Sequence, residues 1–468
     1  MLKQLRHECR VFGVYAPNQN VADLTYLGLY SLQHRGQEST GIAVSDGTNV
    51  LLAKDMGLVG EVFDETILKS LTGHLAIGHV RYSTCGSTYL VNAQPILVHY
   101  ARGSLALAHN GTLLNMASLR AELEKKGALF QSTSDSEVIA HLIARSPKAK
   151  IEGAIKETMA KLSGAFSLVV MTEDKLIGVM DSNGFRPLVI GKLPDGGYVI
   201  ASETCALDVV GAELVRDMKP GEMVVVDKNG LKSETSQTSK HISNCVFEFI
   251  YFARPDSIIR GNTVQDVRMK MGELLWAQRE TAADIVMPIP DSGVYAAMGY
   301  SRASGLPYQE GLLKNKYIGR TFIKPQQGDR DTSVRIKLNP IPSVIRGKRV
   351  VLVDDSIVRG TTSRHLVKMV KDAGAKEVHF RITSPPIKWS CYYGIDTPER
   401  KNLIASSKTI KEIEKFLGAD SLEYMSIENL VKAVNLPKKE LCLACLNGNY
   451  PIKIQDSVGK FVLEGGSI

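Results

Sequence analysis

The sequence predicts two domains of different class, an α+β domain followed by an α/β domain with a parallel sheet. Two observations support this prediction. From residue 9 to about residue 230, short strands alternate with turns, and two clear helical patterns interrupt them. Farther along the chain an apolar strand, a helix and a second strand follow one another in the order of a βαβ unit.

The composition is that of an ordinary globular chain. It has 468 residues, 44% hydrophobic and 23% charged, which is enough apolar surface for two or three packed domains. Lys and Arg outnumber Asp and Glu by 57 to 49, but without the dense basic runs of a nucleic-acid-binding arm. No window approaches the roughly 18 apolar residues of a membrane span, and the charged start is unlike a secretory signal. We therefore expect a soluble, cytoplasmic protein that binds neither nucleic acid nor membrane.

The strand-rich part of the chain contains helical patterns at residues 136–143 and 151–162. The stretch 229–244 is rich in Ser, Thr, Lys and Asn and poor in apolar residues, so it is the best candidate for the connection between the domains.

The βαβ unit follows this connection. Residues 350–353 form a short apolar run suited to a buried strand. Residues 366–373 repeat apolar side chains at helical spacing, and Gly374 can end that helix. Apolar side chains then alternate over residues 378–382, which predicts the next parallel strand.

The segment 350–362 places two carboxylates where the first of these strands ends. Asp354 and Asp355 precede a small-residue loop that opens the helix. In open α/β sheets ligands bind at this edge, and a loop of this kind offers N–H groups, Thr hydroxyls and a helix N-terminus to a phosphate. The carboxylates suit ribose hydroxyls or a Mg²⁺ ion carried by a diphosphate. A helix-capping turn with two solvated acids is the alternative.

The same segment closely resembles the binding signature of type I phosphoribosyltransferases, whose substrate is phosphoribosyl pyrophosphate (PRPP). The resemblance implies that Asp354 and Asp355 hold the ribose hydroxyls and one Mg²⁺ per subunit, while the loop wraps the 5′-phosphate. The remaining PRPP-binding residues that it implies are Ser356, Arg359, Gly360, Thr361 and Thr362.

Two further segments resemble parts of the same family. Residues 288–293 resemble its pyrophosphate loop, and Ser292 is the matching hydroxyl beside the metal. Residues 314–322 and the polar stretch up to Leu338 resemble a flexible lid that closes over PRPP and excludes water.

In the first domain, Cys9 lies just before an expected strand at residues 11–15. A lone cysteine beside an apolar strand is usually a packed core thiol, so the interpretation depends on the polar loops that follow. These loops cover residues 32–38, 78–84, 108–113 and 133–137. In this order they resemble the glutamine amidotransferases with an N-terminal cysteine nucleophile, whose fold is an αββα sandwich.

That resemblance implies that Cys9 is the nucleophile and that its own α-amine is the base, once residues 1–8 are removed as a propeptide. A free α-amine has a pKa of about 8, so it can accept the thiol proton near neutrality. Asn110, through its side-chain amide, and Gly111, through its N–H group, are the implied oxyanion hole.

The same resemblance implies which residues bind the amino-acid end of the glutamine substrate. Arg81 pairs with the α-carboxylate of glutamine, and Asp135 pairs with its α-ammonium, so each charge meets its opposite. For Asp135 the alternative is a simple cap of the helix that starts at Ser136.

Arg10 departs from the pattern of these amidotransferases, which usually have Gly directly after the nucleophile. Gly tolerates positive φ and close backbone approach, whereas a long cationic side chain needs room in the pocket. We therefore expect Arg10 to slow the use of glutamine while leaving free ammonia usable.

Seven cysteines are too few and too scattered for a secreted disulfide scaffold. Cys442 and Cys445 have the spacing that lets two thiolates reach one metal centre, and Cys245 and Cys391 complete a set of four. This set resembles the ligands of one [4Fe-4S] cluster per subunit in a subgroup of the family named below. Zinc is the alternative, because ligand identity alone does not separate the two.

Together the motifs resemble the amidophosphoribosyltransferase family over residues 7–450, and residues 249–257 match that family in particular. The resemblance implies conversion of PRPP, glutamine and water to 5-phosphoribosylamine, glutamate and pyrophosphate at the start of de novo purine synthesis. It also implies a homotetramer and feedback inhibition by purine nucleotides. The implied division is a propeptide (1–8), a glutaminase domain (9–235), a phosphoribosyltransferase domain with the cluster ligands (236–450) and a tail (451–468).

Three alternatives stay open. A sugar-phosphate amidotransferase shares the N-terminal half but carries sugar-isomerase domains in place of the Asp354 and Asp355 site. A non-catalytic PRPP-sensing regulator needs a nucleic-acid-binding module, which the sequence does not indicate. A family member that uses only ammonia is the third, because of Arg10.

Overall fold

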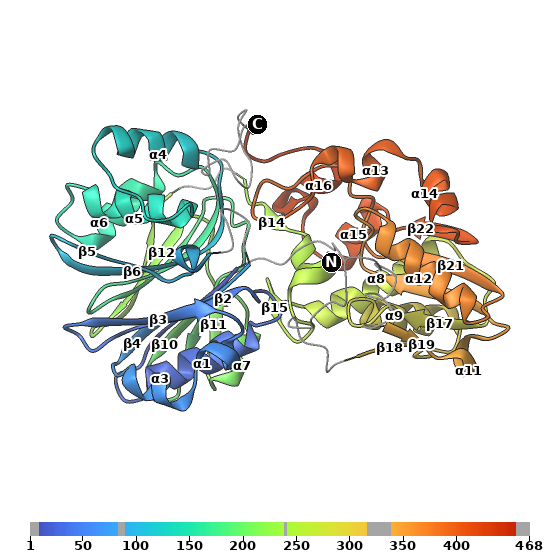
Figure 1. Cartoon of the computed structure of the whole chain (residues 1–468), viewed down its shortest axis with the longest axis horizontal. Helices are drawn as coiled ribbons and strands as arrows, with labels where there is room; N and C mark the ends of the chain where they lie inside the picture. The colour runs from blue at the N-terminus through green and yellow to red at the C-terminus, as the bar shows by residue number, and fades with distance from the viewer. Residues whose placement is uncertain (1–8, 83–88, 238–240, 316–337, 455–468) are drawn as a thin grey trace.

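The computed structural model describes residues 9–82, 89–237, 241–315 and 338–454 (Figure 1). The N-terminal part, blue to green in the figure, and the C-terminal part, yellow to red, form two lobes that lie side by side. Several predicted segments lie outside the described residues: the propeptide 1–8, the end of the loop 78–84, the lid over 316–337 and the tail from 455.

Two antiparallel sheets form the N-terminal domain. The strands of the first sheet are β1 (Arg10–Tyr15), β2 (Ser39–Ser45), β3 (Val50–Met56), β4 (Leu75–Arg81), β9 (Val189–Lys192), β10 (Tyr198–Ala201) and β11 (Glu213–Asp217). Those of the second are β5 (Ile96–Tyr100), β6 (Gly103–Leu113), β7 (Gly164–Met171), β8 (Leu176–Met180), β12 (Glu222–Asp227) and β13 (Gly230–Thr235). Across the described residues the strand orders are β11-β9-β10-β1-β4-β2-β3 and β13-β12-β8-β7-β6-β5.

The two sheets pack face to face through one buried apolar layer. Val11 and Ile77 of the first sheet belong to the same core cluster as Ala108 and Val169 of the second. Gly13 permits the close approach, since a Cβ atom there would lie 2.6 Å from the Val169 side chain. The alternation of side chains along each strand therefore decides which face is buried between the sheets.

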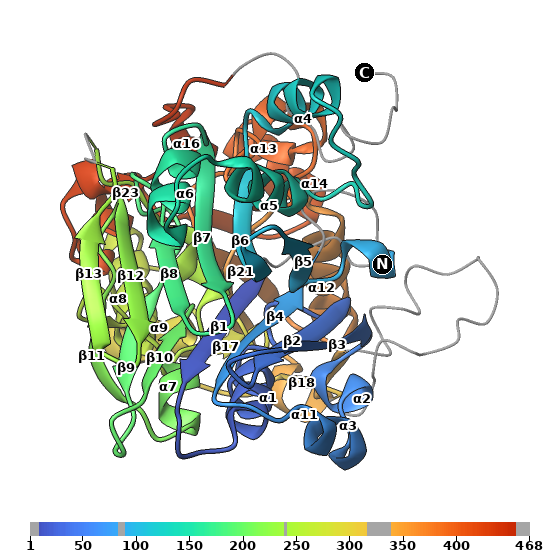
Figure 2. The same ribbon diagram turned by 90° about the vertical axis from the view of Figure 1, so that its left-hand side faces the viewer.

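Helices cover both outer faces, so the layers run helix, sheet, sheet, helix (Figure 2). On the first sheet lie α1 (Val21–Ser31), α2 (Val59–Val62), α3 (Glu65–Ser70) and α7 (Cys205–Val209). On the second lie α4 (Met116–Lys125), α5 (Asp135–Arg145) and α6 (Ile151–Met159). This arrangement confirms the predicted αββα sandwich.

The structure confirms α5 and α6, although α6 ends before the predicted residue 162, and it adds α1, which the sequence did not predict. Gly28 and several β-branched or aromatic residues weaken the intrinsic helix propensity of α1. Tertiary packing compensates, because a Cβ atom at Gly28 would lie 2.4 Å from the ring of Phe12 beneath it. The Asn20 side chain caps the helix by accepting a hydrogen bond from Ala22 N at 3.1 Å.

A parallel sheet forms the centre of the second domain, as predicted. Its adjacent strands are β17 (Ile285–Pro288), β20 (Arg349–Asp354), β21 (Glu377–Ile382) and β22 (Ser421–Tyr424). One face is covered by α8 (Val264–Gln278), α9 (Val294–Ser304) and α15 (Ile427–Val434), and the other by α12 (Thr361–Asp372) and α14 (Ile410–Leu417). The predicted βαβ unit is β20-α12-β21, and Gly374, with φ of 99°, lies just past the helix end.

The predicted connection between the domains, residues 229–244, is partly wrong. Residues 230–235 form β13, which pairs with β12 at the edge of the second sheet, because a polar sequence suits a strand with an exposed face. The chain then forms β14 (Asn244–Cys245), which pairs in parallel with β23 (Leu441–Cys442). The segment leaving the first domain therefore joins the C-terminal end of the second.

Shorter elements complete the fold. They are β15 (Ile258–Ile259), β16 (Asn262–Thr263), β18 (Leu312–Lys314), β19 (Leu338–Pro340), α11 (Pro342–Ile345), α13 (Ile404–Ser407), α16 (Ala444–Asn447), the short 3-10 helices η1 (Leu90–Asn92), η3 (Arg400–Asn402) and η4 (Lys438–Glu440), and the π-helical turn η2 (Glu248–Phe252). None of the helices in the described ranges has the length and apolar character needed to cross a membrane.

Replacing Gly272 by Ala is expected to destabilise the second domain. A Cβ atom at this position of α8 would lie 1.9 Å from the Ala296 carbonyl oxygen of α9. Overpacking of this kind costs about 1–3 kcal/mol, so the midpoint of thermal unfolding should fall. Gly60→Ala in α2 is the control, since the nearest atom to its new Cβ lies 3.8 Å away. Equal midpoints for Gly272→Ala and wild type would contradict the close packing of α8 on α9.

Candidate active sites

The first candidate site is centred on Cys9, directly before β1. Its side chain is buried, and Sγ donates a hydrogen bond to the Tyr82 carbonyl oxygen at 3.3 Å. Burial raises the pKa of the Cys9 thiol to about 11, although the charge of Arg81 opposes that rise. In a chain that still carries residues 1–8, the thiol is therefore protonated at neutral pH and is a weak nucleophile.

A small cavity brings the predicted residues together. Its lining consists of Cys9, Arg81, Tyr82, Gln94, His109, Gly111, Ser134 and Asp135. Its volume of about 10 Å³ is enough for roughly one water molecule. This cavity is smaller than glutamine, so binding of glutamine requires it to widen.

Arg81 and Asp135 place opposite charges around this cavity. Arg81 ends β4, and Asp135 is the first residue of α5. Asp135 Oδ2 accepts a hydrogen bond from Leu113 N at 3.0 Å, and Oδ1 lies 3.7 Å from His109 Nδ1. Burial acts to raise the pKa of Asp135, but His109, Leu113 N–H and Arg81 together hold it below its ordinary value. The cavity thus offers a cation and a carboxylate to a zwitterionic amino acid.

The capping alternative for Asp135 is wrong. Ser134 is the N-cap of α5, and its hydroxyl accepts a hydrogen bond from Ser136 N at 3.3 Å. The Asp135 carboxylate is consequently available to the cavity.

Asn110 and Gly111 lie next to each other in β6. Gly111 has φ of 151°, and a Cβ atom there would lie 2.0 Å from the Ala165 carbonyl oxygen, so only glycine fits. Both terminal atoms of the Asn110 amide form hydrogen bonds in one orientation of the amide. In it, Nδ2 donates to the Cys9 carbonyl oxygen and Oδ1 accepts from Arg10 Nη1, both at 2.9 Å. Asn110 therefore contacts the residue of the nucleophile itself, whereas Gly111 lines the cavity.

Arg10 does not crowd the cavity, so the physical reason that the sequence suggested for slow glutamine use is wrong. Its side chain is fully buried and is absent from the cavity lining. Nη1 donates to the Cys9 carbonyl oxygen at 2.8 Å, and Nη2 donates to Glu248 Oε1 at 3.1 Å. A long cation is tolerated beside the nucleophile because a buried carboxylate neutralises it.

Sequence reasoning missed residues that hold this site in place. Gln94 Oε1 accepts a hydrogen bond from His109 N at 2.7 Å, and His79 Nε2 lies 3.0 Å from the His109 carbonyl oxygen. Burial lowers the pKa of His79 to about 3, so this ring is neutral. His79 and His109 lie inside the motifs that identified the site, whereas nothing in the sequence singles out Gln94.

The second candidate site lies where β20 ends. Asp354 and Asp355 are buried, and Asp355 N donates to Asp354 Oδ1 at 2.9 Å. Ser292, from the loop after β17, donates its hydroxyl to Asp354 Oδ1 at 3.2 Å. The structure thus brings together the two loops that the sequence singled out separately, so the alternative of two solvated acids is wrong.

The carboxylate pair has the chemistry of a divalent-cation site. Burial, followed by the charge of Asp355, raises the pKa of Asp354 well above its ordinary value. Burial also raises the pKa of Asp355, although the Ser356 hydroxyl and the Arg268 guanidinium oppose that rise. Two buried carboxylates that repel one another are relieved by a cation, and oxygen atoms are the ligands that Mg²⁺ prefers. The donor set therefore fits Mg²⁺.

The predicted phosphate loop leads directly into α12. Gly360 is the N-cap residue with φ of 75°, a left-handed conformation that favours glycine, and Thr361 is the first helical residue. The described loop and first turn place the predicted residues in one continuous stretch: Ser356, Arg359, Gly360, Thr361 and Thr362. A helix N-terminus with two Thr side chains beside it suits an anionic phosphate.

The four remaining predicted ligands lie near one another. Cys245 and Cys442 are partners in the parallel pairing of β14 with β23. Burial, and then the neighbouring thiols of Cys391, Cys442 and Cys245, raises the pKa of Cys445 well above its ordinary value. Even so, within the described ranges no group of three or more His, Cys, Asp or Glu side chains is arranged to hold a metal ion. The thiols have the right chemistry for a cluster, but this conformation does not form its coordination shell.

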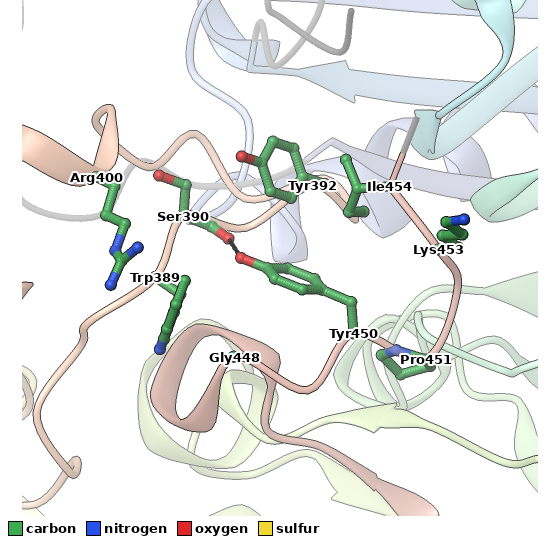
Figure 3. A pocket seen from close by; sticks show the side chains of 9 residues that line it. All are labelled: Trp389, Ser390, Tyr392, Arg400, Gly448, Tyr450, Pro451, Lys453 and Ile454. Atoms are coloured by element: carbon green, nitrogen blue, oxygen red, sulfur yellow. Dashed lines mark hydrogen bonds between the residues drawn. The ribbon is translucent and has the colours of Figure 1, made fainter. Parts of the chain in front are cut away.

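A separate hollow of about 720 Å³ lies beside these cysteines and shares no residue with either candidate site (Figure 3). Arg400 stacks on Trp389, with its guanidinium carbon 3.5 Å from the ring centroid. Tyr450 donates its hydroxyl to the Ser390 carbonyl oxygen at 2.6 Å. The hollow contains none of the predicted catalytic residues.

Replacing Asp354 by Asn is expected to increase the stability of the protein and to lower its activity. Losing one carboxylate removes the repulsion within the buried pair, so the midpoint of thermal unfolding of the metal-free protein should rise. Since the pKa of Asp354 is raised in the folded state, this gain should grow as the pH rises above the ordinary Asp value of about 4. Mg²⁺-dependent pyrophosphate release from PRPP should fall at least about 100-fold.

Asp372→Asn, at the exposed end of α12, is the control for Asp354→Asn and should change neither property. A lower midpoint for Asp354→Asn than for wild type would contradict the strained state of the carboxylate pair.

Comparison with known proteins agrees with the two predicted kinds of domain. A family model described as a glutamine amidotransferase domain matches residues 79–209, and one described as a phosphoribosyl transferase domain matches residues 262–384. The second match leaves no support for a sugar-phosphate amidotransferase.

Whole proteins and solved structures are similar over nearly the entire chain. An amidophosphoribosyltransferase of Synechococcus elongatus is 50% identical over 463 residues, which are 97% of this chain and 94% of that protein. A structure described as the allosteric regulatory enzyme of purine biosynthesis has a TM-score of 0.93 at 46% identity, covering 98% and 100% of the two chains. The glutamine PRPP amidotransferase of B. subtilis, solved with ADP and GMP, has a TM-score of 0.92 at 47% identity, covering 96% and 99%. This chain belongs to the amidophosphoribosyltransferase family.

Proposed function

We propose that this protein makes 5-phosphoribosylamine, glutamate and pyrophosphate from PRPP, glutamine and water, the first step of de novo purine synthesis. The observation that carries the proposal is the presence of two complementary sites in one chain. One lines a single cavity with a thiol, a cation and a carboxylate, and the other places a carboxylate pair before a phosphate loop. The similarity to amidophosphoribosyltransferases over nearly the whole chain supports it.

In the glutaminase half, Cys9 Sγ attacks the amide carbon of glutamine. Removal of residues 1–8 gives Cys9 a free α-amine, which takes the thiol proton and returns it to the departing ammonia. The oxyanion accepts hydrogen bonds from the Asn110 side-chain amide and from Gly111 N–H. Water then hydrolyses the thioester, releases glutamate and restores the thiol.

The other end of glutamine is bound by charge. Arg81 receives the α-carboxylate, and Asp135 receives the α-ammonium. Both residues border the cavity beside Cys9, which supports these roles. Because the cavity now fits about one water molecule, binding must be accompanied by an opening movement.

In the transferase half, ammonia displaces pyrophosphate from C1 of the ribose. Asp354 and Asp355 bind the ribose hydroxyls and would hold one Mg²⁺ together with Ser292, and this ion would steady the leaving pyrophosphate. The loop and first turn of α12 bind the 5′-phosphate through the following residues: Ser356, Arg359, Gly360, Thr361 and Thr362.

The four cysteines are proposed to bind one [4Fe-4S] cluster per subunit, with zinc as the alternative. Their segments come from the connection between the domains, from the second domain itself and from its C-terminal part, so a bound centre would tie β14, α16 and the segment at Cys391 together. Burial is the main cause of the high pKa values of Cys442 and Cys445, so both thiols are protonated without a metal. They therefore lose their protons when a metal binds.

The remaining proposals concern the organisation and regulation of the protein. We propose a homotetramer in the cytoplasm, with feedback inhibition by purine nucleotides, a proposal supported by the B. subtilis structure that was solved with ADP and GMP. The proposed division is a propeptide (1–8), a glutaminase domain (9–235), a phosphoribosyltransferase domain (236–450) and a tail (451–468).

The proposed reaction predicts a selective effect of Cys9→Ser. With glutamine as the nitrogen donor, pyrophosphate release from PRPP and Mg²⁺ should fall by at least about 1,000-fold, because the weaker nucleophile cannot form the thioester. With ammonium as the donor, release should stay near the wild-type rate. Wild-type protein active with ammonium alone would indicate the ammonia-only alternative, and folded protein active with neither donor would contradict the enzymatic function.

The cluster proposal predicts about four iron and four sulfide per chain in protein purified without oxygen. Cys445→Ser should lower both by at least half, because one of the four ligands is lost. Cys205→Ala is the control, since Cys205 is buried in the core of the first domain. Chemical analysis of iron, sulfide and zinc checks this, and about one zinc with no iron would establish the alternative.

A further inference from the structure

Arg10 lies between the two groups that carry out the proposed glutaminase chemistry. Its Nη1 donates to the Cys9 carbonyl oxygen at 2.8 Å and lies 2.9 Å from one of the two terminal atoms of the Asn110 amide. The other terminal atom of that amide lies 2.9 Å from the same Cys9 carbonyl oxygen. All three residues are buried, so water does not compete for these contacts.

The charge of Arg10 allows only one orientation of the Asn110 amide. An amide can turn by 180° and exchange its oxygen with its nitrogen, and the two orientations differ only in their hydrogen bonds. A guanidinium group is a permanent cation that donates and never accepts, so it is compatible with the oxygen and repels the nitrogen. The Asn110 oxygen therefore faces Arg10, and the nitrogen faces Cys9.

This orientation is the one that an oxyanion hole requires. The Asn110 nitrogen carries two hydrogens, of which one is donated to Cys9 O. In the opposite orientation a carbonyl oxygen would face the nucleophile and repel the developing oxyanion. We propose that Arg10 is a positioning residue of the glutaminase site, which fixes the Asn110 amide with its N–H groups toward the nucleophile. The inference rests on the glutaminase half of the proposed function.

Two buried carboxylates hold Arg10 in place. Its Nη2 donates to both oxygens of Glu248, at 3.1 and 3.2 Å, and its Nε lies 3.5 Å from Glu203. The guanidinium group is thus contacted on both edges, and movement away from Asn110 would leave buried charge unpaired. Arg10 consequently acts on the site as part of a rigid ion cluster.

This role reverses the expectation from the sequence. A residue that orients the oxyanion hole supports the use of glutamine, whereas crowding would slow it. The effect should appear in the chemical step, because the described contacts of Arg10 are with the Cys9 carbonyl group, the Asn110 amide and two buried carboxylates.

The test compares Arg10→Gln and Arg10→Met with wild type, with glutamine and separately with ammonium as donor. Gln can accept as well as donate, so it no longer selects one orientation, and Met removes the contact altogether. We expect kcat with glutamine to fall about 10-fold for Gln and about 100-fold for Met. KM for glutamine should stay within about threefold and the ammonium rate near wild type.

A double-mutant cycle tests whether Arg10 acts through Asn110. Asn110→Ala alone should lower kcat with glutamine by about 100-fold or more, and adding Arg10→Met should then lower it by less than about threefold. Arg10→Lys keeps a donor and a positive charge, so it should restore at least part of the rate lost in the Met variant. Two guanidinium groups, Arg35 and Arg186, still face Glu203 and Glu248 without Arg10, so the Met variant is expected to fold.

Four results would overturn the inference. Unchanged kcat in both Arg10 variants would show that the Asn110 amide needs no such anchor. If kcat fell equally with glutamine and with ammonium, Arg10 would have a general structural role. The same would follow if the fold-losses in kcat of Arg10→Met and Asn110→Ala multiplied fully in the double variant. Wild-type protein that fails with glutamine but works with ammonium would instead overturn the proposed glutaminase function itself, together with this inference.

Discussion

The buried carboxylate of Glu248 is the contact on which the arrangement of the two domains depends. Three arginines of the first domain, Arg10, Arg35 and Arg186, converge on it. Glu248 itself belongs to η2, just after the chain has left that domain. A buried charge that loses its partners costs several kcal/mol, so the domains can separate only by exposing or stranding these groups. The cluster therefore determines how the domains meet.

The same junction places both sites relative to one another. On one side, Arg10 contacts the carbonyl group of the nucleophile. On the other, the Phe249 carbonyl oxygen, one residue after Glu248, accepts a hydrogen bond from Arg268 at 2.9 Å. The charge of Arg268 in turn opposes the rise in the pKa of Asp355. One short segment thus connects, through its contacts with Arg10 and Arg268, the residues around Cys9 with the carboxylate pair of the second candidate site.

Local patterns in the sequence predicted the parts of this structure that local physics determines. Asp354, the loop after it and helix α12 follow from strand, turn and helix signals within one continuous segment, residues 350–374. Contacts between distant residues could not be predicted in this way. Arg35 lies within a motif that identified the first domain, yet its partner Glu248 is 213 positions away in the sequence. The edge strand β13 was taken for a linker because its polar side chains resemble those of a loop.

The ion cluster and the active sites differ in how their buried charges are compensated. Glu248 has its compensating charges within the chain, so it is stable without any ligand. Cys9 has a thiol whose pKa burial raises to about 11, and Asp354 has a carboxyl group whose pKa is raised by burial and by its neighbour. The ionised forms of these two groups become favourable only when a free α-amine, a substrate or a cation is supplied. A compensated cluster maintains the architecture, and the uncompensated groups beside it are where chemistry takes place. Arg10 belongs to the compensated ion cluster and contacts the residue that carries the Cys9 thiol. A residue that the sequence suggested would crowd the site can therefore organise it.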